Sequence, residues 1–471
     1  MVSAILSSST PFVEFDARLI RKFNGSGLRY RCYPTAEHFT ESFGYRDYLQ
    51  AIAGLRTRGN RNPLALYVHI PFCDTICYYC VANKIITRNH DKASAYLDYL
   101  KREIEMQGQL FSGMNQVEKL HVGGGTPTYL SRMQMAELSA HLRRWFKFAA
   151  DDAGEYSIEI DPRSATTARI ASLREQGFNR LTISVQDFDP EVQKAVNRIQ
   201  PEGQTLGLLR AAQDANFRSV SIDLLYGLPR QNVMTLAQTL MKLVDAGPDS
   251  ILLRQYLHMP HAYKSHGNMD EKDIPGVEAR LDMLSVCCRR LSDAGYVYIG
   301  MGHFTRSDDA LVVAQRQGRL HRNYQGYSTH TDMDMVACGV SAISAVGATY
   351  SQNVKTLDAY YDHLDRNELP IARGIKLNMD DMLRRLIIQM LMCNFELSIA
   401  SIETAYPIIF KDYFAVEIEK LQALAQDGLL TMDGEWINIS AKGRMLVHVI
   451  CSVFDRYFNA KPALLRSAYT I

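Results

Sequence analysis

The sequence LALYVHIPFCDTICYYCVANK, residues Leu64–Lys84, determines both the fold and the chemistry that we expect of this chain. It opens with an apolar run rich in β-forming residues, Leu64–Ile70, which predicts a buried strand. The run breaks at Pro71, and three cysteines follow in one short loop: Cys73, Cys77 and Cys80. Three thiolates can bind three irons of a [4Fe–4S] cluster, which leaves the fourth iron open to another ligand.

The CxxxCxxC spacing of this loop resembles that of radical S-adenosylmethionine (SAM) enzymes. The resemblance implies that SAM chelates the open iron through its amino and carboxylate groups. It also implies that an electron from the cluster then cleaves the sulfonium to give a deoxyadenosyl radical. The cofactor would therefore perform the most difficult step of the reaction.

Zinc, a disulfide and buried structural thiols are the alternative interpretations of these cysteines. Structural zinc needs four ligands, and no second ligand pair lies nearby in the sequence. A disulfide is disfavoured because the N-terminus lacks the basic segment of a secretory signal. The remaining cysteines beyond the loop are expected to be small buried apolar residues: Cys287, Cys288, Cys338, Cys393 and Cys451.

The composition is that of a globular chain with one large domain and one or two smaller ones. Its 471 residues are 47% hydrophobic, and the formal net charge is +1. Because no sustained Lys/Arg run is present, nucleic acid is not an expected partner. No apolar run is long enough to cross a bilayer, so we expect a cytoplasmic protein, in a compartment that would also protect an oxygen-labile cluster.

From Leu64 onward, short β-rich runs alternate with longer helical patterns, which predicts a parallel sheet with crossover helices. We therefore expect an α/β fold, a partial (β/α)6 barrel of the radical SAM type. The predicted strands are Leu64–Ile70, Val117–Val122, Tyr156–Ile160, Arg180–Val185, Ser219–Leu225 and Ile251–Tyr256.

Polar or glycine-rich groups follow most of these strands, where chemistry is located in barrels of this class. The second strand leads into Gly123–Gly125 and Thr126, and the later strands lead to acidic or amide side chains. Each residue alone could be an ordinary strand-end cap. Their shared location favours a binding site that includes Glu159, Gln186, Arg198 and Asp223.

Domain boundaries are expected near residues 50 and 365. Residues 1–50 predict an extended N-terminal arm with turns at Gly25–Gly27 and Pro34. Residues 51–365 form the catalytic domain, in which residues 303–347 are either a binding loop or a solvated connection. A linker around Arg366–Asp380 leads into a C-terminal helical domain, 366–471, whose helices and Asp433-Gly434 hairpin resemble a winged helix. Without a basic stripe, we interpret it as a substrate lid or packing domain.

Nearly the whole chain resembles oxygen-independent coproporphyrinogen III oxidases. The matching phrases include YVHIPFC, GGGTPTYL, SIEIDPR, IDLLYGLP, HRNYQGY and GVSAIS. The resemblance implies a monomeric enzyme with a [4Fe–4S] cluster and two SAM molecules. It implies a tetrapyrrole substrate whose propionates lose CO2, and an electron donor such as flavodoxin or ferredoxin. Pocket cations would bind the propionates, and the candidates are Arg31, Lys84, Arg306 and Arg322.

The resemblance also assigns residues by position, without a catalytic residue beyond the cofactor ligands. The cluster ligands are Cys73, Cys77 and Cys80. The first SAM site comprises Tyr67, Gly124, Gly125, Thr126, Glu159, Gln186, Arg198 and Asp223. The second SAM site comprises Leu225, Leu257, Tyr324, Gln325 and Ile343.

Three departures from the family pattern lie near the expected pocket. Ala82 stands where the family has a further cysteine, and Gly302 stands where it has an aspartate. Leu257 replaces a small residue. These departures suggest a paralogue, and the leading alternative is a two-SAM radical methylase or cyclopropane-forming enzyme. A haem-binding chaperone is a weaker alternative, because such relatives usually lack the long N-terminal arm.

Overall fold

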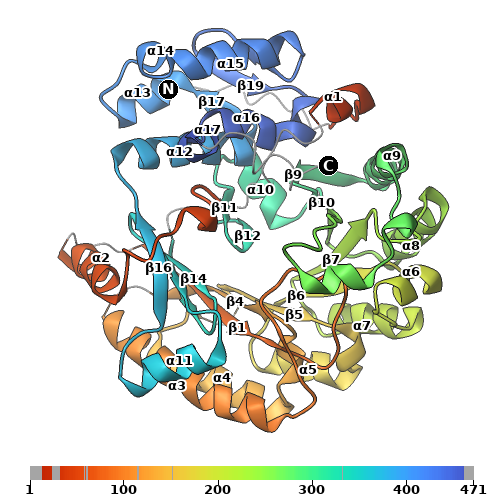
Figure 1. The fold of residues 1–471 in the computed structure, drawn as a ribbon, viewed down its shortest axis with the longest axis vertical. Coiled ribbons are helices and arrows are strands. Elements are labelled where there is room, and N and C mark those ends of the chain that lie inside the picture. The colour runs from red at the N-terminus through yellow and green to blue at the C-terminus, as the bar shows by residue number, and fades with distance from the viewer. Residues whose placement is uncertain are drawn as a thin grey trace.

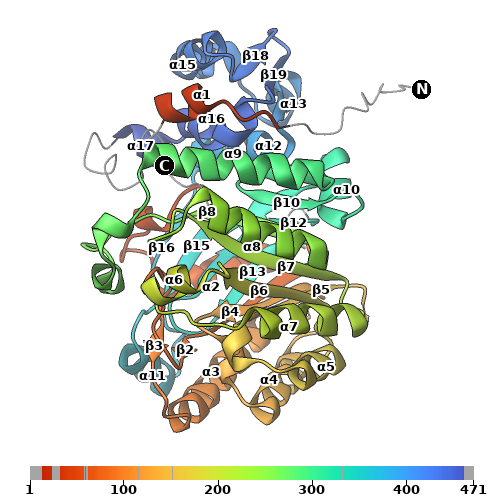
Figure 2. The same ribbon diagram turned by 90° about the vertical axis from the view of Figure 1, so that its right-hand side faces the viewer.

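The molecule is a curved sheet with helices on its outer face and a smaller, mostly helical C-terminal unit above one end (Figure 1). The computed structural model describes residues 13–23, 32–57, 59, 62–113, 116–150, 152–330 and 333–460. Figure 2 shows the long helices running along the outside of the sheet, with the C-terminal helices grouped above it.

Six parallel strands form the centre of the sheet and are neighbours in the order in which they occur in the chain. Their bounds differ from the predicted ranges by at most two residues, so the predicted strands and the partial (β/α)6 barrel are confirmed. The strands are β1 (Leu64–Ile70), β4 (Val117–Gly124), β5 (Glu155–Ile160), β6 (Arg180–Gln186), β7 (Ser219–Tyr226) and β8 (Ser250–Gln255).

Along β5, β6, β7 and β8, side chains alternate between a buried apolar outer face and a partly exposed inner face. In β7, Val220, Ile222 and Leu224 are buried, whereas Ser221 and Asp223, which alternate with them, are partly exposed. The apolar face packs under the crossover helices because a strand with period-2 alternation can bury only one side. The inner face is therefore left for polar groups and ligands.

Several of the crossover helices begin at a residue whose side chain supplies a hydrogen-bond partner that the helix terminus lacks. In α8, Asn232 forms a capping box with Thr235, and Gly247 ends the helix in the left-handed conformation.

No helix of the described ranges is both long and apolar enough to cross a membrane. The helices around the barrel are α3 (Asp91–Leu110), α4 (Arg132–Trp145), α5 (Thr167–Glu175), α6 (Pro190–Ala195), α7 (Glu202–Asp214), α8 (Val233–Ala246) and α9 (Val277–Asp293).

The sheet continues on both sides of the barrel strands, and this extension corrects two expectations. Residues 303–347 are not a single loop or connection, since they contain five strands and one helix. Residues Ile371–Lys376, expected within a linker, form the outer strand of the main sheet. The added elements are β9 (Tyr296–Gly300), β10 (His303–Arg306), α10 (Ala310–Arg316), β11 (His321–Asn323), β12 (Gly326–Ser328), β13 (Asp334–Cys338), β14 (Ile343–Val346), β15 (Thr349–Asn353), α11 (Leu357–Asp365) and β16 (Ile371–Lys376).

The C-terminal unit contains the predicted helices and hairpin, and β17 adds a third strand to the hairpin. The hairpin turns at Asp433, whose carboxylate accepts hydrogen bonds from the N–H groups of Glu435 and Trp436. After the hairpin, the chain forms a 3-10 turn (Gly443–Leu446) and two short helices. The elements are α12 (Met379–Asn394), β17 (Glu396–Ser398), α13 (Ile399–Ala405), α14 (Phe410–Tyr413), α15 (Ala415–Gln426), β18 (Leu430–Met432), β19 (Trp436–Ile439), α16 (Val447–Val453) and α17 (Arg456–Ala460).

The N-terminal arm is partly helical rather than extended throughout. It contains α1 (Ala17–Lys22) and begins α2 (Tyr45–Thr57) within its expected range. Arg21 forms an ion pair with Glu278 of α9, while Thr40 pairs with Gly374 of β16. The arm therefore connects α9 of the barrel to the edge of the main sheet. The expected turn at Gly25–Gly27 lies outside the described residues.

Candidate functional site

The three cysteines lie in a loop that begins directly after β1 and is closed by its own backbone hydrogen bonds. β2 (Phe72–Cys73) pairs with β3 (Ile85–Ile86), and the N–H of Ile85 donates to the carbonyl of Pro71 at 2.7 Å. All three thiols are free. The loop thus holds its cysteines at the carboxyl end of the central strand.

These thiols suit a cluster better than a single metal ion. Among the described residues, no three His, Cys, Asp or Glu side chains converge as ligands of one ion. Cluster thiolates bind different irons, so their sulfurs do not need to converge on one point. Burial raises the pKa of Cys73 to about 12 and also raises the pKa of Cys80, so bound iron would have to stabilise both thiolates.

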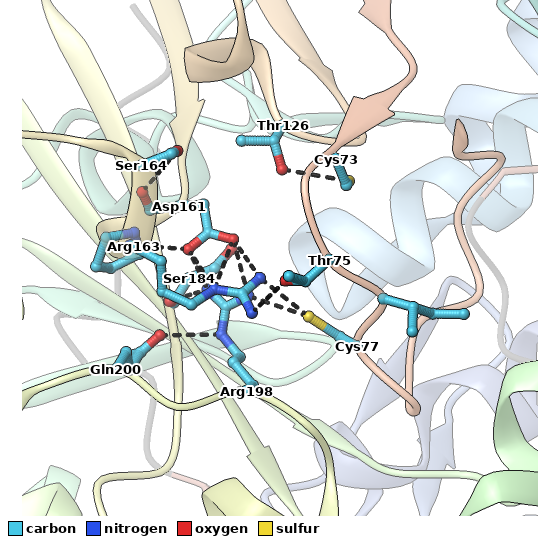
Figure 3. Close-up of polar contacts among 12 residues, drawn as sticks. Cys73, Thr75, Cys77, Thr126, Asp161, Arg163, Ser164, Ser184, Arg198 and Gln200 are labelled. Atoms are coloured by element: carbon cyan, nitrogen blue, oxygen red, sulfur yellow. Dashed lines mark hydrogen bonds and ion pairs between the residues drawn. The ribbon is translucent and has the colours of Figure 1, made fainter. Parts of the chain in front are cut away.

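Two arginines and one aspartate surround Cys77 (Figure 3). Arg163 Nη2 lies 3.2 Å and Arg198 Nη1 lies 3.5 Å from Cys77 Sγ. Both guanidinium groups also bind Asp161, at 2.7 and 3.2 Å. Although burial opposes ionisation, Arg198 and Arg163 lower the pKa of Asp161 to about 2. The sequence reasoning omitted Asp161 and Arg163 from the site, although both stand in the SIEIDPR phrase after the third predicted strand.

The glycines at the end of β4 have no room for a side chain, because they pack against β1 and the start of the cysteine loop. A Cβ atom on Gly125 would lie 2.6 Å from the Pro71 carbonyl oxygen, and one on Gly124 would lie 2.7 Å from the His69 ring. Gly124 also has a φ of +117°. Beside them, Thr126 Oγ1 lies 3.3 Å from Cys73 Sγ on the side away from Cys77 (Figure 3). The expected SAM contacts of these residues remain a proposal.

Tyr67 and Glu159 meet at His121 on the inner face of the sheet. The ring of Tyr67 stacks on that of His121 with centroids 5.8 Å apart, and Glu159 Oε1 lies 3.2 Å from His121 Nε2. Burial opposes ionisation of Glu159, but hydrogen bonding to His121 and to the Gly124 N–H holds its pKa below the usual value. The pairing keeps a carboxylate at the carboxyl ends of the strands.

Asp223 and Gln186 follow on the neighbouring strands. Asp223 binds Arg254 of β8, yet burial still raises the pKa of Asp223. Gln186 ends β6 with a φ of +69°, and its Oε1 is buried with no hydrogen-bond partner among the described residues. A buried acceptor without a donor costs free energy, so Gln186 fits a ligand that supplies one.

The residues expected at the second SAM site divide between two places. Leu225 packs in an apolar cluster with Tyr78 and Tyr79 of the cysteine loop, and Leu257 follows β8. Tyr324 and Ile343 instead belong to an apolar cluster around Phe39, Tyr350 and Leu377, which joins the arm to the sheet. Both polar side-chain atoms of Gln325 are buried without a partner in the described part of the chain.

The four expected propionate partners also differ in position. Lys84 donates to the Cys80 carbonyl at 2.9 Å and so stays on the cysteine loop. The expectation for Arg306 is wrong, because β10 runs antiparallel to β8 and carries Arg306 to the amino end of β8, away from the cysteine loop. There the backbone N–H of Arg306 donates to the backbone carbonyl of Asp249, the residue before β8. Arg322 lies on β11, where its Nε and Nη1 atoms are buried. Arg31 is not among the described residues.

Comparisons with known proteins agree with this arrangement. The Radical SAM superfamily model matches residues 67–243, and the HemN C-terminal domain model matches residues 377–446. Two relatives are named oxygen-independent coproporphyrinogen III oxidase. The Pseudomonas aeruginosa protein is 45% identical over 97% of this chain and 98% of its own length, and the Escherichia coli protein is 46% identical over 95% and 97%.

The solved structure of coproporphyrinogen III oxidase from Escherichia coli, described as a radical SAM enzyme, superimposes with a TM-score of 0.90 at 44% identity. It covers 94% of this chain and 99% of that structure. The likeness therefore extends over the barrel and the C-terminal unit together.

Proposed function

The chain belongs to the oxygen-independent coproporphyrinogen III oxidase family of radical SAM enzymes, and from this premise we propose that it converts coproporphyrinogen III to protoporphyrinogen IX. The reaction removes two propionate carboxyl groups as CO2 and serves haem biosynthesis. The observation that supports it most is the three-cysteine loop at the carboxyl end of a parallel barrel, within a chain that matches these oxidases nearly end to end.

The enzyme uses a [4Fe–4S] cluster and SAM, as its family does. We assign the cluster to Cys73, Cys77 and Cys80. When bound, the reduced cluster and SAM supply hydrogen abstraction from the substrate side chain. Two SAM molecules and the residues assigned to each by position remain part of the proposal.

The described side chains position these groups rather than react. Arg163 and Arg198 donate hydrogen bonds toward the Cys77 sulfur, and such bonds help to set the properties of a cluster. Glu159 of β5 and Asp223 of β7, on either side of β6, present carboxylates that suit the SAM ammonium group. Gln186 offers its unpartnered carbonyl oxygen to a donor on the ligand.

We also propose a monomer that works in the cytoplasm and receives electrons from flavodoxin or ferredoxin. The cytoplasmic location is supported by the nine free cysteines, which need a compartment that keeps thiols reduced. The monomer and the electron donor rest on the resemblance to the family. We keep the division into an arm, a catalytic domain and a C-terminal helical domain as a proposal. β16 would then fall on the C-terminal side of a boundary at residue 366.

Product mass tests the proposed function. Incubated anaerobically with coproporphyrinogen III, SAM, a reductant and an electron acceptor, the enzyme is expected to form 5′-deoxyadenosine and a tetrapyrrole lighter by two CO2 and four hydrogen atoms, because each propionate becomes a vinyl group. Formation of 5′-deoxyadenosine with unchanged porphyrinogen would contradict the proposal and favour the methylase alternative. Recovery of decarboxylation in Ala82→Cys with Leu257→Ala would then identify these two positions as the cause.

A further inference from the structure

Two arginines, where the C-terminal unit meets the β11–β12 hairpin, lack the carboxylate partner that buried arginines usually have. They are Arg322 on β11 and Arg385 on α12, and the β11–β12 hairpin lies between α12 and the barrel strands (Figure 1). Neither forms an ion pair within the described ranges. Arg384, next along α12, shows the ordinary case, since it binds Asp380 at 2.9 Å and Glu417 at 2.8 Å.

Aromatic and neutral groups surround these arginines. The Arg322 guanidinium lies 4.6 Å from the centroid of the Tyr327 ring, and its Nε and Nη1 atoms are buried without a partner. Arg385 Nη1 reaches only the hydroxyl of Tyr350, at 3.4 Å. The positive charge is therefore not neutralised by the neighbouring side chains.

Titratable neighbours confirm that the two charges act on one region. Burial, with the charges of Arg322 and Arg254, lowers the pKa of His303 well below its usual value, so this imidazole is neutral. Burial raises the pKa of Cys32, while Arg385 and Arg322 both oppose that effect. Of these arginines, only Arg254 has a carboxylate, that of Asp223.

Buried guanidinium N–H groups without acceptors are costly, and a carboxylate matches their paired donor geometry. Gln325, two residues after Asn323 ends β11, adds an independent sign of a missing ligand because its amide nitrogen and oxygen are both buried and unpartnered. The region thus has cationic donors and a further hydrogen-bonding group.

We propose that Arg322 and Arg385 form a carboxylate subsite that binds propionates of the tetrapyrrole which are retained in the product. This inference rests on the proposed function. An arginine pair stabilises a bound carboxylate and would oppose its departure as CO2, so it suits propionates that do not react. The reacting propionates would then be directed away from this subsite.

Equilibrium dialysis of the anaerobically reconstituted enzyme against two porphyrins tests the subsite. Coproporphyrin III has four propionates, whereas mesoporphyrin IX has ethyl groups in place of the two that react. Arg322→Gln and Arg385→Gln are each expected to raise the dissociation constant of both porphyrins by about tenfold or more. Arg322→Lys keeps the charge without the paired donors, so an intermediate loss is expected. Arg306→Gln, at the opposite strand end, is the matched control and is expected to change neither constant.

Iron content and melting temperature establish that each variant is folded and loaded. Weaker binding of coproporphyrin III alone would assign the arginines to the reacting propionates and overturn the proposal. Weaker binding of SAM with unchanged porphyrin affinity would assign the carboxylate to SAM and also overturn it. Failure of the unsubstituted enzyme to bind either porphyrin would contradict the proposed function itself, whereas equal binding by wild type and variants would contradict only the subsite.

Discussion

The cysteine loop and the β11–β12 hairpin, which we call the cysteine side and the hairpin side, differ in whether their buried arginines have a carboxylate partner. Around Cys77, the guanidinium groups of Arg163 and Arg198 are both bound to Asp161. On the β11–β12 hairpin, Arg322 has buried N–H groups without acceptors. This difference matches the two proposals, in which the arginines at Cys77 orient a resident cofactor and Arg322 binds a carboxylate of the substrate.

Loss of a cysteine of the loop is expected to have the largest effect on the cysteine side, because it removes a ligand of the cluster. Cys77→Ala removes one of three thiolates, so SAM cleavage and the cluster absorbance should both disappear after anaerobic reconstitution. Cys32→Ala is the matched control, because this thiol lies near Tyr350 on the hairpin side and should leave the cluster intact. Full cleavage activity in Cys77→Ala would refute the ligand assignment.

Removal of the central carboxylate on the cysteine side is expected to have the next largest effect. Asp161→Asn leaves Arg198, which is 4% exposed, and Arg163 without their anion. Breaking a buried ion pair in this way costs about 3–5 kcal/mol, measurable by urea unfolding. Asp308→Asn, whose partner Arg306 is exposed, provides the comparison and should change stability little. Equal stability of the two variants would show that the network is not structurally required.

The central parallel strands were predictable from sequence because their signals are local. The short β-rich runs that form these strands and the cysteine spacing after Leu64–Ile70 are both signals that lie within a few residues of the chain. β13 was not predictable in the same way, since its five residues become a strand only by pairing with β1, far away in the chain. Distant pairing also explains Arg306, because the direction of β10 is set by β8 and β9.

The candidate site shows the same limit. Sequence reasoning included Arg322 among the pocket cations, but Arg385 stands in an amphipathic helix pattern next to an arginine that is fully paired. Only the tertiary structure distinguishes these two neighbours. The interaction of Arg198 with Asp161 likewise joins the loop after α6 to the end of β5, and spacing along the chain does not reveal it.

The smallest predicted effect concerns Glu103, a fully buried acid of α3 that supports the cysteine strand from outside the sheet. Its carboxylate accepts hydrogen bonds from the Gly339 N–H at 2.6 Å and from Asn353 and Tyr360. About two turns earlier on α3, Tyr96 donates to the His69 carbonyl of β1 at 2.8 Å. Burial nevertheless raises the pKa of Glu103 to about 7, with Tyr360 opposing the shift.

Because this pKa is raised in the folded state, the fold favours the protonated form and loses stability as pH rises. From the ordinary carboxyl pKa up to about 7, unfolding should become easier by about 3 kcal/mol and then level off. Glu103→Gln has no proton to lose, so its free energy of unfolding should lack this slope. Urea unfolding of wild type and variant at a series of pH values between 4.5 and 8 measures the difference. If wild type and variant showed parallel profiles of unfolding free energy against pH, Glu103 would be ionised in the folded protein. Its hydrogen-bond donors would then stabilise the carboxylate, as the two arginines stabilise that of Asp161.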